Sequence, residues 1–116
     1  MNKYLNGKIY VIICYKTDKH YYGSTYQNLN VRLSKHKYDL KGAMGLGNVE
    51  RHYRTSADVL INDNYEIILI KDYPCQNKKE LQTEEYRLMN LANEYYNVVN
   101  KTGLINYKKK NNKING

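Results

Sequence analysis

The chain has 116 residues, which allows one small domain with a single hydrophobic core and excludes a second domain with a function of its own. Lysine and arginine outnumber aspartate and glutamate by 19 to 11, and the resulting net charge of +8 suits a polyanionic partner. The chain is also rich in the lysine, asparagine, isoleucine and tyrosine that an AT-biased genome encodes, so charge alone does not establish that partner.

Residues 8–14 predict the first strand of a sheet. The run KIYVIIC is β-branched and aromatic, and it is apolar at both alternating sets of positions, as is typical of a central strand covered on both faces. Tyr10, Ile12 and Cys14 share one of these faces. Residues 16–19 are polar and turn-like, so residues 20–24 are expected to return as a hairpin partner, with Tyr21 near the end of the sheet that carries Tyr10.

A change of period after Asn28 predicts an amphipathic helix, whose entry Asn28 can cap. The apolar seam of this helix consists of Leu29, Leu33 and Leu40. Arg32 and His36 lie four residues apart and therefore stack on one face beside the seam. We expect them to reach the sheet surface without being buried in the core.

The second half predicts a short helix over residues 55–62, a strand over 65–71 and a last helix over 78–95, after a glycine-rich, mobile loop at 41–50. The expected buried side of the last helix carries Leu81, Leu88, Ala92 and Tyr95. Residues 1–105 therefore predict one α/β (α+β) domain with a three-stranded, mostly antiparallel sheet flanked by helices. Residues 106–116 form a Lys/Asn-rich tail that we expect to be disordered.

Neither the cysteines nor the hydropathy of the chain indicate a secreted or membrane protein. Cys14 lies in an apolar strand and Cys75 follows the single proline, and their spacing matches neither a metal knuckle nor a redox pair. No apolar run reaches the length of a membrane span, and the first six residues lack the apolar core of a signal peptide. We expect buried or incidental thiols in a soluble, intracellular protein that does not bind membranes.

Five short patterns follow one another along the chain in a fixed order. They are KIY (ending at Tyr10), YYGST (from Tyr21), R-x-x-x-H (Arg32 and His36), ELQTEE (residues 80–85) and YNV (residues 96–98). In order and spacing they resemble the GIY-YIG nuclease superfamily over roughly residues 7–100. Lys8 stands in place of the first glycine of the name motif and Tyr22 in place of the central isoleucine of the second, and neither change removes a reactive side chain.

The resemblance implies metal-dependent hydrolysis of DNA phosphodiester bonds by a one-metal mechanism. Tyr10 would be the general base, Arg32 would bind the scissile phosphate, and Tyr21 would orient water or phosphate. His36 would either relay the proton from Tyr10 or hydrogen-bond the phosphate, and the sequence leaves both roles open. Glu85 would hold a single Mg²⁺, for which Mn²⁺ can substitute, because Mg²⁺ prefers oxygen ligands and retains waters.

A tyrosine base requires an altered pKa. The ordinary tyrosine pKa is about 10, so only about one phenol in a thousand is ionised at neutral pH. We expect Arg32 and the metal to lower the pKa of Tyr10 towards neutrality, because nearby positive charge favours the phenolate.

Two assignments have a competing neighbour. Glu84 competes with Glu85 as the metal ligand, and Glu85 is preferred because the step from Leu81 matches the family pattern. Asn97 matches a late asparagine of the family that supports the site without reacting, and Asn100 is its alternative.

Basic side chains near the site would contact the DNA backbone, and the candidates are Arg32, Lys35, Arg51 and Arg54. The wording of the motifs resembles free-standing, homing-endonuclease-like nucleases of large DNA viruses and mobile elements. One active site cuts one strand, so double-strand cleavage would call for a transient homodimer.

Each of these side chains also has an ordinary structural explanation when taken alone. A strand tyrosine usually packs in a core, and charged residues on a helix are usually a solvated face. Their conjunction in order, on strand, strand, helix and helix, favours a shared site. The main alternative function is a catalytically weak or inactive nucleic-acid-binding module that acts in a larger complex.

Overall fold

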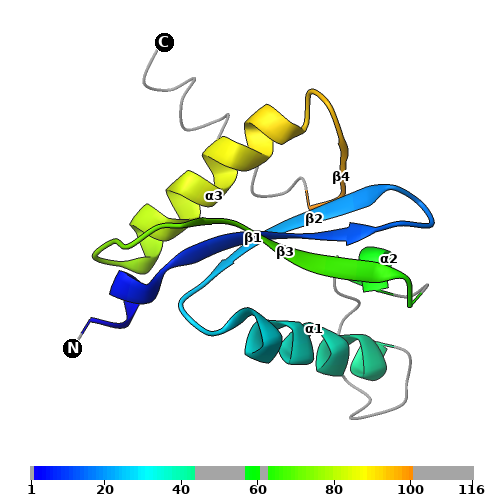
Figure 1. The fold of residues 1–116 in the computed structure, drawn as a ribbon, viewed down its shortest axis with the longest axis horizontal. Coiled ribbons are helices and arrows are strands. Elements are labelled where there is room, and N and C mark those ends of the chain that lie inside the picture. Colours follow the sequence, from blue (N-terminus) through cyan, green and yellow to red (C-terminus); the bar gives the residue numbers. More distant parts are fainter. Residues whose placement is uncertain (1, 44–56, 61–62, 101–116) are drawn as a thin grey trace.

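The computed structural model describes residues 2–43, 57–60 and 63–100, and within them a sheet separates two layers of helices. The sheet has the strand order β3-β1-β2-β4, with α3 on one side of it and α1 and α2 on the other (Figure 1). The elements are the 3₁₀ helix η1 (Lys3–Asn6), β1 (Lys8–Cys14), β2 (Lys19–Thr25), α1 (Leu29–Ala43), α2 (Ala57–Leu60), β3 (Tyr65–Asp72), α3 (Lys78–Ala92) and β4 (Asn97–Val98). The predicted mixed α/β class is confirmed.

Strand β1 is central, as its two apolar faces predict. It pairs antiparallel with β2 on one side and with β3 on the other. Tyr10, Ile12 and Cys14 face α1 and α2 and form one buried cluster with residues of those helices. Ile9 and Val11 point to the opposite face and pack in clusters with side chains of α3. Two apolar faces on one strand therefore account for the helix layer on each side of the sheet.

The predicted number of strands is wrong by one, and the extra strand defines an edge. Strand β4 is two residues long, too short to show a periodic pattern, and it pairs in parallel only with Lys19 and His20 of β2. The next contact along this edge, at Tyr22, comes from the side chain of Asn100. Its Oδ1 accepts from the backbone N–H of Tyr22 at 3.1 Å, and its Nδ2 donates to the backbone carbonyl of Tyr22. Within the described part of the chain, β2 has no further strand partner on this edge beyond that point.

Helices α1 and α3 begin where the sequence predicts. The Asn28 side chain accepts from the N–H of Asn30 at 2.8 Å, and Asn77 accepts from that of Glu80 at 2.9 Å, so each helix entry has a side-chain cap. Helix α3 ends at Ala92, and Tyr95 lies beyond it with 78% of its surface exposed, so its predicted place on the buried side is wrong. Met89 is the buried residue near the end of that side.

Cys14 and Cys75 are both buried and neither forms a disulfide, as predicted. None of the helices in the described ranges has the length and apolar character needed to cross a membrane. The loop predicted over 41–50 starts too early, because residues 41–43 belong to α1. Residues 44–50, Arg51, Arg54 and the tail over 106–116 lie outside the described residues.

Candidate active site

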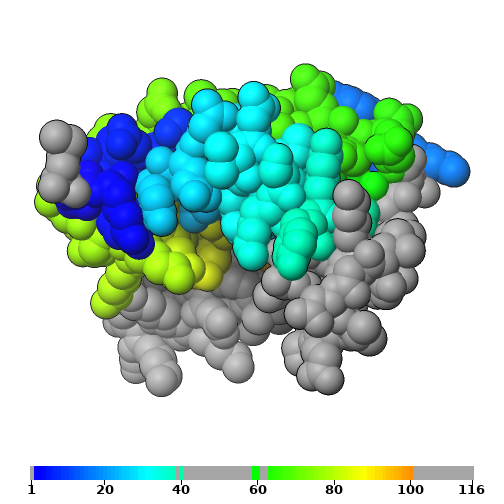
Figure 2. Space-filling model, turned by 90° about the horizontal axis from the view of Figure 1, so that it is seen from below, coloured from blue at the N-terminus to red at the C-terminus, as the bar shows by residue number. Residues whose placement is uncertain are grey.

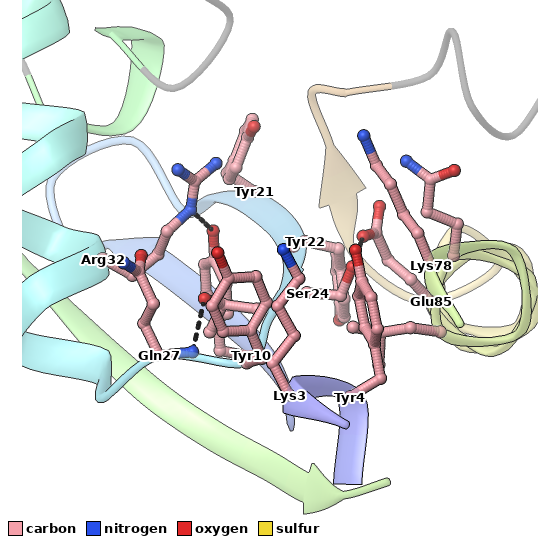
Figure 3. A pocket seen from close by; sticks show the side chains of 15 residues that line it. Lys3, Tyr4, Tyr10, Tyr21, Tyr22, Ser24, Gln27, Arg32, Lys78 and Glu85 are labelled. Carbon is pink, nitrogen blue, oxygen red and sulfur yellow. Dashed lines mark hydrogen bonds between the residues drawn. The ribbon is translucent and has the colours of Figure 1, made fainter. Parts of the chain in front are cut away.

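A pocket of about 510 Å³ opens around the edge of β2 that β4 leaves uncovered. On the surface, the N-terminal segment, the turn between β2 and α1, and the start of α3 gather on the same face (Figure 2). Arg32 points in from one side, and Glu85 and Lys78 from the other (Figure 3). The lining residues are Lys3, Tyr4, Tyr10, Tyr21, Tyr22, Gly23, Ser24, Thr25, Tyr26, Gln27, Arg32, Lys78, Leu81, Gln82 and Glu85.

The hydroxyl of Tyr10 joins an imidazole to a guanidinium. His36 Nε2 lies 2.7 Å from the Tyr10 hydroxyl oxygen, and Arg32 Nε donates to that oxygen at 3.2 Å. Because Arg32 donates to the oxygen, the simplest arrangement has the phenol donating its own proton to His36. Tyr21 contacts the same imidazole edge-on, with ring centroids 5.2 Å apart. Four predicted site residues from β1, β2 and α1 therefore meet at one point.

The predicted exposure of His36 is wrong. Its side chain is 3% exposed and lies between the rings of Tyr10 and Tyr21. The reason is visible in the seam of α1, because residue 36 falls between Leu33 and Leu40 at the same helical spacing. A histidine at an apolar seam position is the signal that could have indicated a buried imidazole facing the sheet.

The expected lowering of the Tyr10 pKa is also wrong for the protein without metal. Burial of Tyr10, which is fully inaccessible, raises its pKa well above the ordinary value. The charge of Arg32 and its hydrogen bond lower that pKa, while Tyr21 and Glu85 raise it. Loss of hydration outweighs the one cation, so Tyr10 is a neutral phenol at neutral pH.

Glu85 lies on the opposite wall of the pocket. Ser24 Oγ donates to its carboxylate at 2.6 Å, across from β2 to α3. Burial raises the pKa of Glu85 to about 7, although the Ser24 hydrogen bond and the Arg32 charge both lower it. Glu85 raises the pKa of Tyr10, and Arg32 lowers that of Glu85, so the two walls interact electrostatically. The carboxylate is therefore one that a cation would stabilise strongly.

Glu84 and Glu85 face different surroundings. Glu84 accepts from Arg87 through both carboxylate oxygens, at 2.6 and 2.7 Å, and from Lys71 of β3 at 2.7 Å. These cations lower the pKa of Glu84 to about 2 against the opposing effect of burial. Glu84 is thus a paired structural carboxylate outside the pocket, and only Glu85 lines it.

The preference for Asn97 over Asn100 is reversed by the structure. Asn97 is exposed in β4 and does not line the pocket. Asn100 holds both backbone polar groups of Tyr22, the residue between Tyr21 and Gly23 of the site. The supporting amide of this region is therefore Asn100.

Gly23 is required because the Tyr10 ring lies against its backbone. The two residues are partners across β1 and β2, and a Cβ at residue 23 would lie closer than 3.0 Å to the ring and hydroxyl of Tyr10. We expect Gly23→Ala to lower the free energy of unfolding by roughly 1–3 kcal/mol, because the buried ring must move. Denaturant unfolding measures this change. A Gly23→Ala variant as stable as the parent would contradict the account.

Several lining residues were not predicted as site residues. Ser24 and Gln82 lie within the YYGST and ELQTEE patterns, and Tyr26 and Gln27 follow YYGST directly, so their positions could have been noticed. Lys3, Tyr4 and Lys78 lie outside the patterns. Lys35, a predicted DNA contact, is exposed on α1 with its amine 5.8 Å from the Tyr38 ring, and it does not line the pocket. The unpredicted lining residues with polar groups include Lys3, Tyr4, Tyr26, Gln27, Lys78 and Gln82.

The donor atoms around Glu85 suit a hard cation. The described residues contain no group of three or more His, Cys, Asp or Glu side chains that could hold a metal. Mg²⁺ needs no such group when one carboxylate holds it and waters and substrate oxygens complete its octahedron. A carboxylate beside a hydroxyl, in a pocket lined by phenols and amides, fits Mg²⁺ or Mn²⁺ better than the nitrogen- and sulfur-seeking metals.

Comparisons of the chain with protein-family models, with curated proteins and with solved structures find no match.

Proposed function

We propose that the protein is a metal-dependent endonuclease of the GIY-YIG type that hydrolyses DNA phosphodiester bonds. One observation carries the proposal: a single polar pocket is lined by Tyr10 and Arg32 on one wall and by the Glu85 carboxylate on the other, and His36 is bonded to Tyr10 behind the first wall. Phosphodiester hydrolysis needs an activated water, a cation for the phosphate and stabilisation of the leaving oxygen. These residues supply the groups for each task.

Arg32 would bind the scissile phosphate. Its guanidinium is always charged and can donate two parallel hydrogen bonds to phosphate oxygens. In the protein without substrate, Arg32 Nε is engaged with the Tyr10 hydroxyl. Transfer of Arg32 to a phosphate would leave the phenol oxygen able to accept a proton from the attacking water.

Tyr10 and His36 would act together as the base. The buried phenol resists ionisation, so a free phenolate is a poor intermediate here. In a relay, the Tyr10 oxygen takes a proton from water as its own proton passes to His36 Nε2, 2.7 Å away. The water oxygen then bonds to phosphorus as the opposite P–O bond breaks. This geometry favours the relay role of His36 over direct contact with the phosphate.

Glu85 would hold the metal, and Ser24 would orient its carboxylate by the 2.6 Å hydrogen bond. Bound at this carboxylate, Mg²⁺ would supply Lewis-acid stabilisation of charge on the phosphate and the leaving oxygen. Lys78 and Lys3 line the same pocket and would add positive charge for the neighbouring phosphates.

Nicking of supercoiled plasmid with Mg²⁺ tests the proposal. We expect nicked circles to precede linear DNA, because one pocket cuts one strand and a double-strand break needs a second copy or a second encounter. Arg32→Ala should lower the nicking rate at least about a hundredfold while DNA binding at low salt persists. DNA binding by the parent without cleavage in Mg²⁺ or Mn²⁺ would overturn the proposal in favour of a binding module.

A further inference from the structure

An aromatic and basic cluster of Lys3, Tyr4 and Tyr26 forms part of the pocket lining. The rings of Tyr4 and Tyr26 meet edge to face, with centroids 5.6 Å apart. The amine of Lys3 lies over both rings, 4.8 Å from the centroid of Tyr26 and 5.6 Å from that of Tyr4. All three residues line the pocket that also holds Tyr10, Arg32 and Glu85.

Tyr4 is held firmly in this cluster. Its ring packs against a buried group that contains Ile9, Cys75 and Leu81. Its carbonyl accepts from the N–H groups of Gly7 and Cys75, both at 3.0 Å, and its own N–H donates to the Asn2 side chain at 3.0 Å. Tyr4 therefore gives Tyr26 a fixed aromatic neighbour in the pocket lining.

Tyr26 is different from Tyr4, because it follows β2 on the surface and 36% of it is exposed. The amine at the end of the flexible Lys3 side chain lies over the Tyr26 ring, and a lysine amine is as well satisfied by a phosphate oxygen as by a ring face. Aromatic side chains next to cations are the usual elements of surfaces that bind unpaired nucleotides, where bases stack and phosphates meet positive charge.

On the basis of the proposed nuclease function, we infer that Tyr26 is a stacking platform for an unpaired nucleobase next to the scissile phosphate, with Tyr4 as its positioning residue and Lys3 on the flanking phosphate. The pocket volume of about 510 Å³ is within the range of small-ligand sites, about 300–1,000 Å³. A base inside a duplex is stacked on its neighbours and cannot occupy the platform, so the chain should prefer single-stranded segments.

Fluorescence anisotropy of a labelled oligodeoxythymidylate, measured without divalent metal so that no cleavage occurs, tests the inference. A labelled blunt-ended duplex, which has no unpaired bases, serves as the comparison. Tyr26→Leu should weaken binding of the single strand about tenfold and change duplex binding less than about twofold, whereas Tyr26→Phe, which keeps the ring, should bind as the parent does. Tyr95→Leu removes a more exposed tyrosine outside this pocket and should change neither affinity.

Equal affinity of the parent and Tyr26→Leu for the single strand would overturn the platform, as would equal losses for the single strand and the duplex. Unfolding temperatures of the variants show whether a loss of binding reflects a loss of fold. The platform and the proposed reaction fail separately. A selective loss in Tyr26→Leu supports the platform even if the parent proves unable to cleave, and cleavage by the parent stands even if Tyr26→Leu binds normally.

Discussion

Glu85→Gln is expected to lower Mg²⁺-dependent nicking of plasmid at least about a hundredfold and to abolish the stabilisation that Mg²⁺ confers on the fold. A neutral amide keeps the shape of the side chain and can still accept from Ser24, but it does not balance the charge of the cation. Nicking assays and unfolding temperatures at increasing Mg²⁺ concentration measure the two effects.

Glu84→Gln is the matched control, because it makes the same change one residue away, on a carboxylate paired with Lys71 and Arg87. It should respond to Mg²⁺ as the parent does. Equal loss of Mg²⁺ response in both variants, or none in Glu85→Gln, would remove Glu85 as the metal ligand.

The same pair of variants should differ in the sign of their effect on stability. The folded-state pKa of Glu85 is raised to about 7 from 4.5. Its contribution to the free energy of unfolding is therefore fully present below pH 4.5 and is lost as pH rises through about 7. The pKa of Glu84 is lowered to about 2, so its contribution is present above pH 4.5 and is lost as pH falls through about 2. At pH 8 without metal, Glu85→Gln should therefore raise the unfolding temperature and Glu84→Gln should lower it.

Proton competition at Glu85 also sets the pH dependence of metal binding. Below about pH 7, in the metal-free protein, the carboxyl is increasingly protonated, so Mg²⁺ affinity should fall by up to about tenfold per pH unit. Isothermal titration of Mg²⁺ at several pH values measures this directly, and an affinity independent of pH between 5 and 7 would contradict it.

Tyr10→Phe is expected to lower nicking by about a hundredfold to ten-thousandfold, because it removes the hydroxyl proposed to take the proton of the attacking water. The phenyl ring keeps the packing against Gly23 and the core cluster. The variant also leaves buried His36 without its 2.7 Å partner, which should cost about 1–3 kcal/mol of stability. Single-turnover nicking at saturating enzyme separates this effect from DNA binding.

Tyr65→Phe provides the control for the loss of a strand phenol. Tyr65 is partly buried against the same core cluster as Tyr10 but does not line the pocket. The nicking rate of the Tyr65→Phe variant should match that of the parent. A Tyr10→Phe variant that is well folded and cleaves at the parental rate would exclude the phenol as the base.

Local patterns in the sequence were sufficient for most of the fold. The run of β1, apolar at both alternating sets of positions, predicted a central strand. The capping residue Asn28 and the leucine seam predicted α1. Such features are encoded by residues that are near neighbours in the chain, so they are readable without the structure. Strand β4 was missed because two residues carry no period, and its pairing with Lys19 and His20 depends on where α3 ends.

Order and spacing likewise selected Tyr10, Tyr21, Arg32, His36 and Glu85 as candidates, but the environment of each was decided by tertiary packing. Glu84 and Glu85 carry the same chemical group, but adjacent residues on a helix point about 100° apart. One therefore meets Lys71 and Arg87, and the other meets Ser24 in the pocket.

The pKa of Tyr10 likewise depends partly on motif spacing and partly on tertiary packing. Arg32 beside the phenol was predictable from motif spacing and does lower the pKa, but complete burial under Gly23 and α1 raises it more. The sequence by itself determined which chemical groups the chain carries and on which elements they lie. Only the tertiary structure decided their hydration, their partners and the pocket they share, because these depend on contacts between segments that are far apart along the chain.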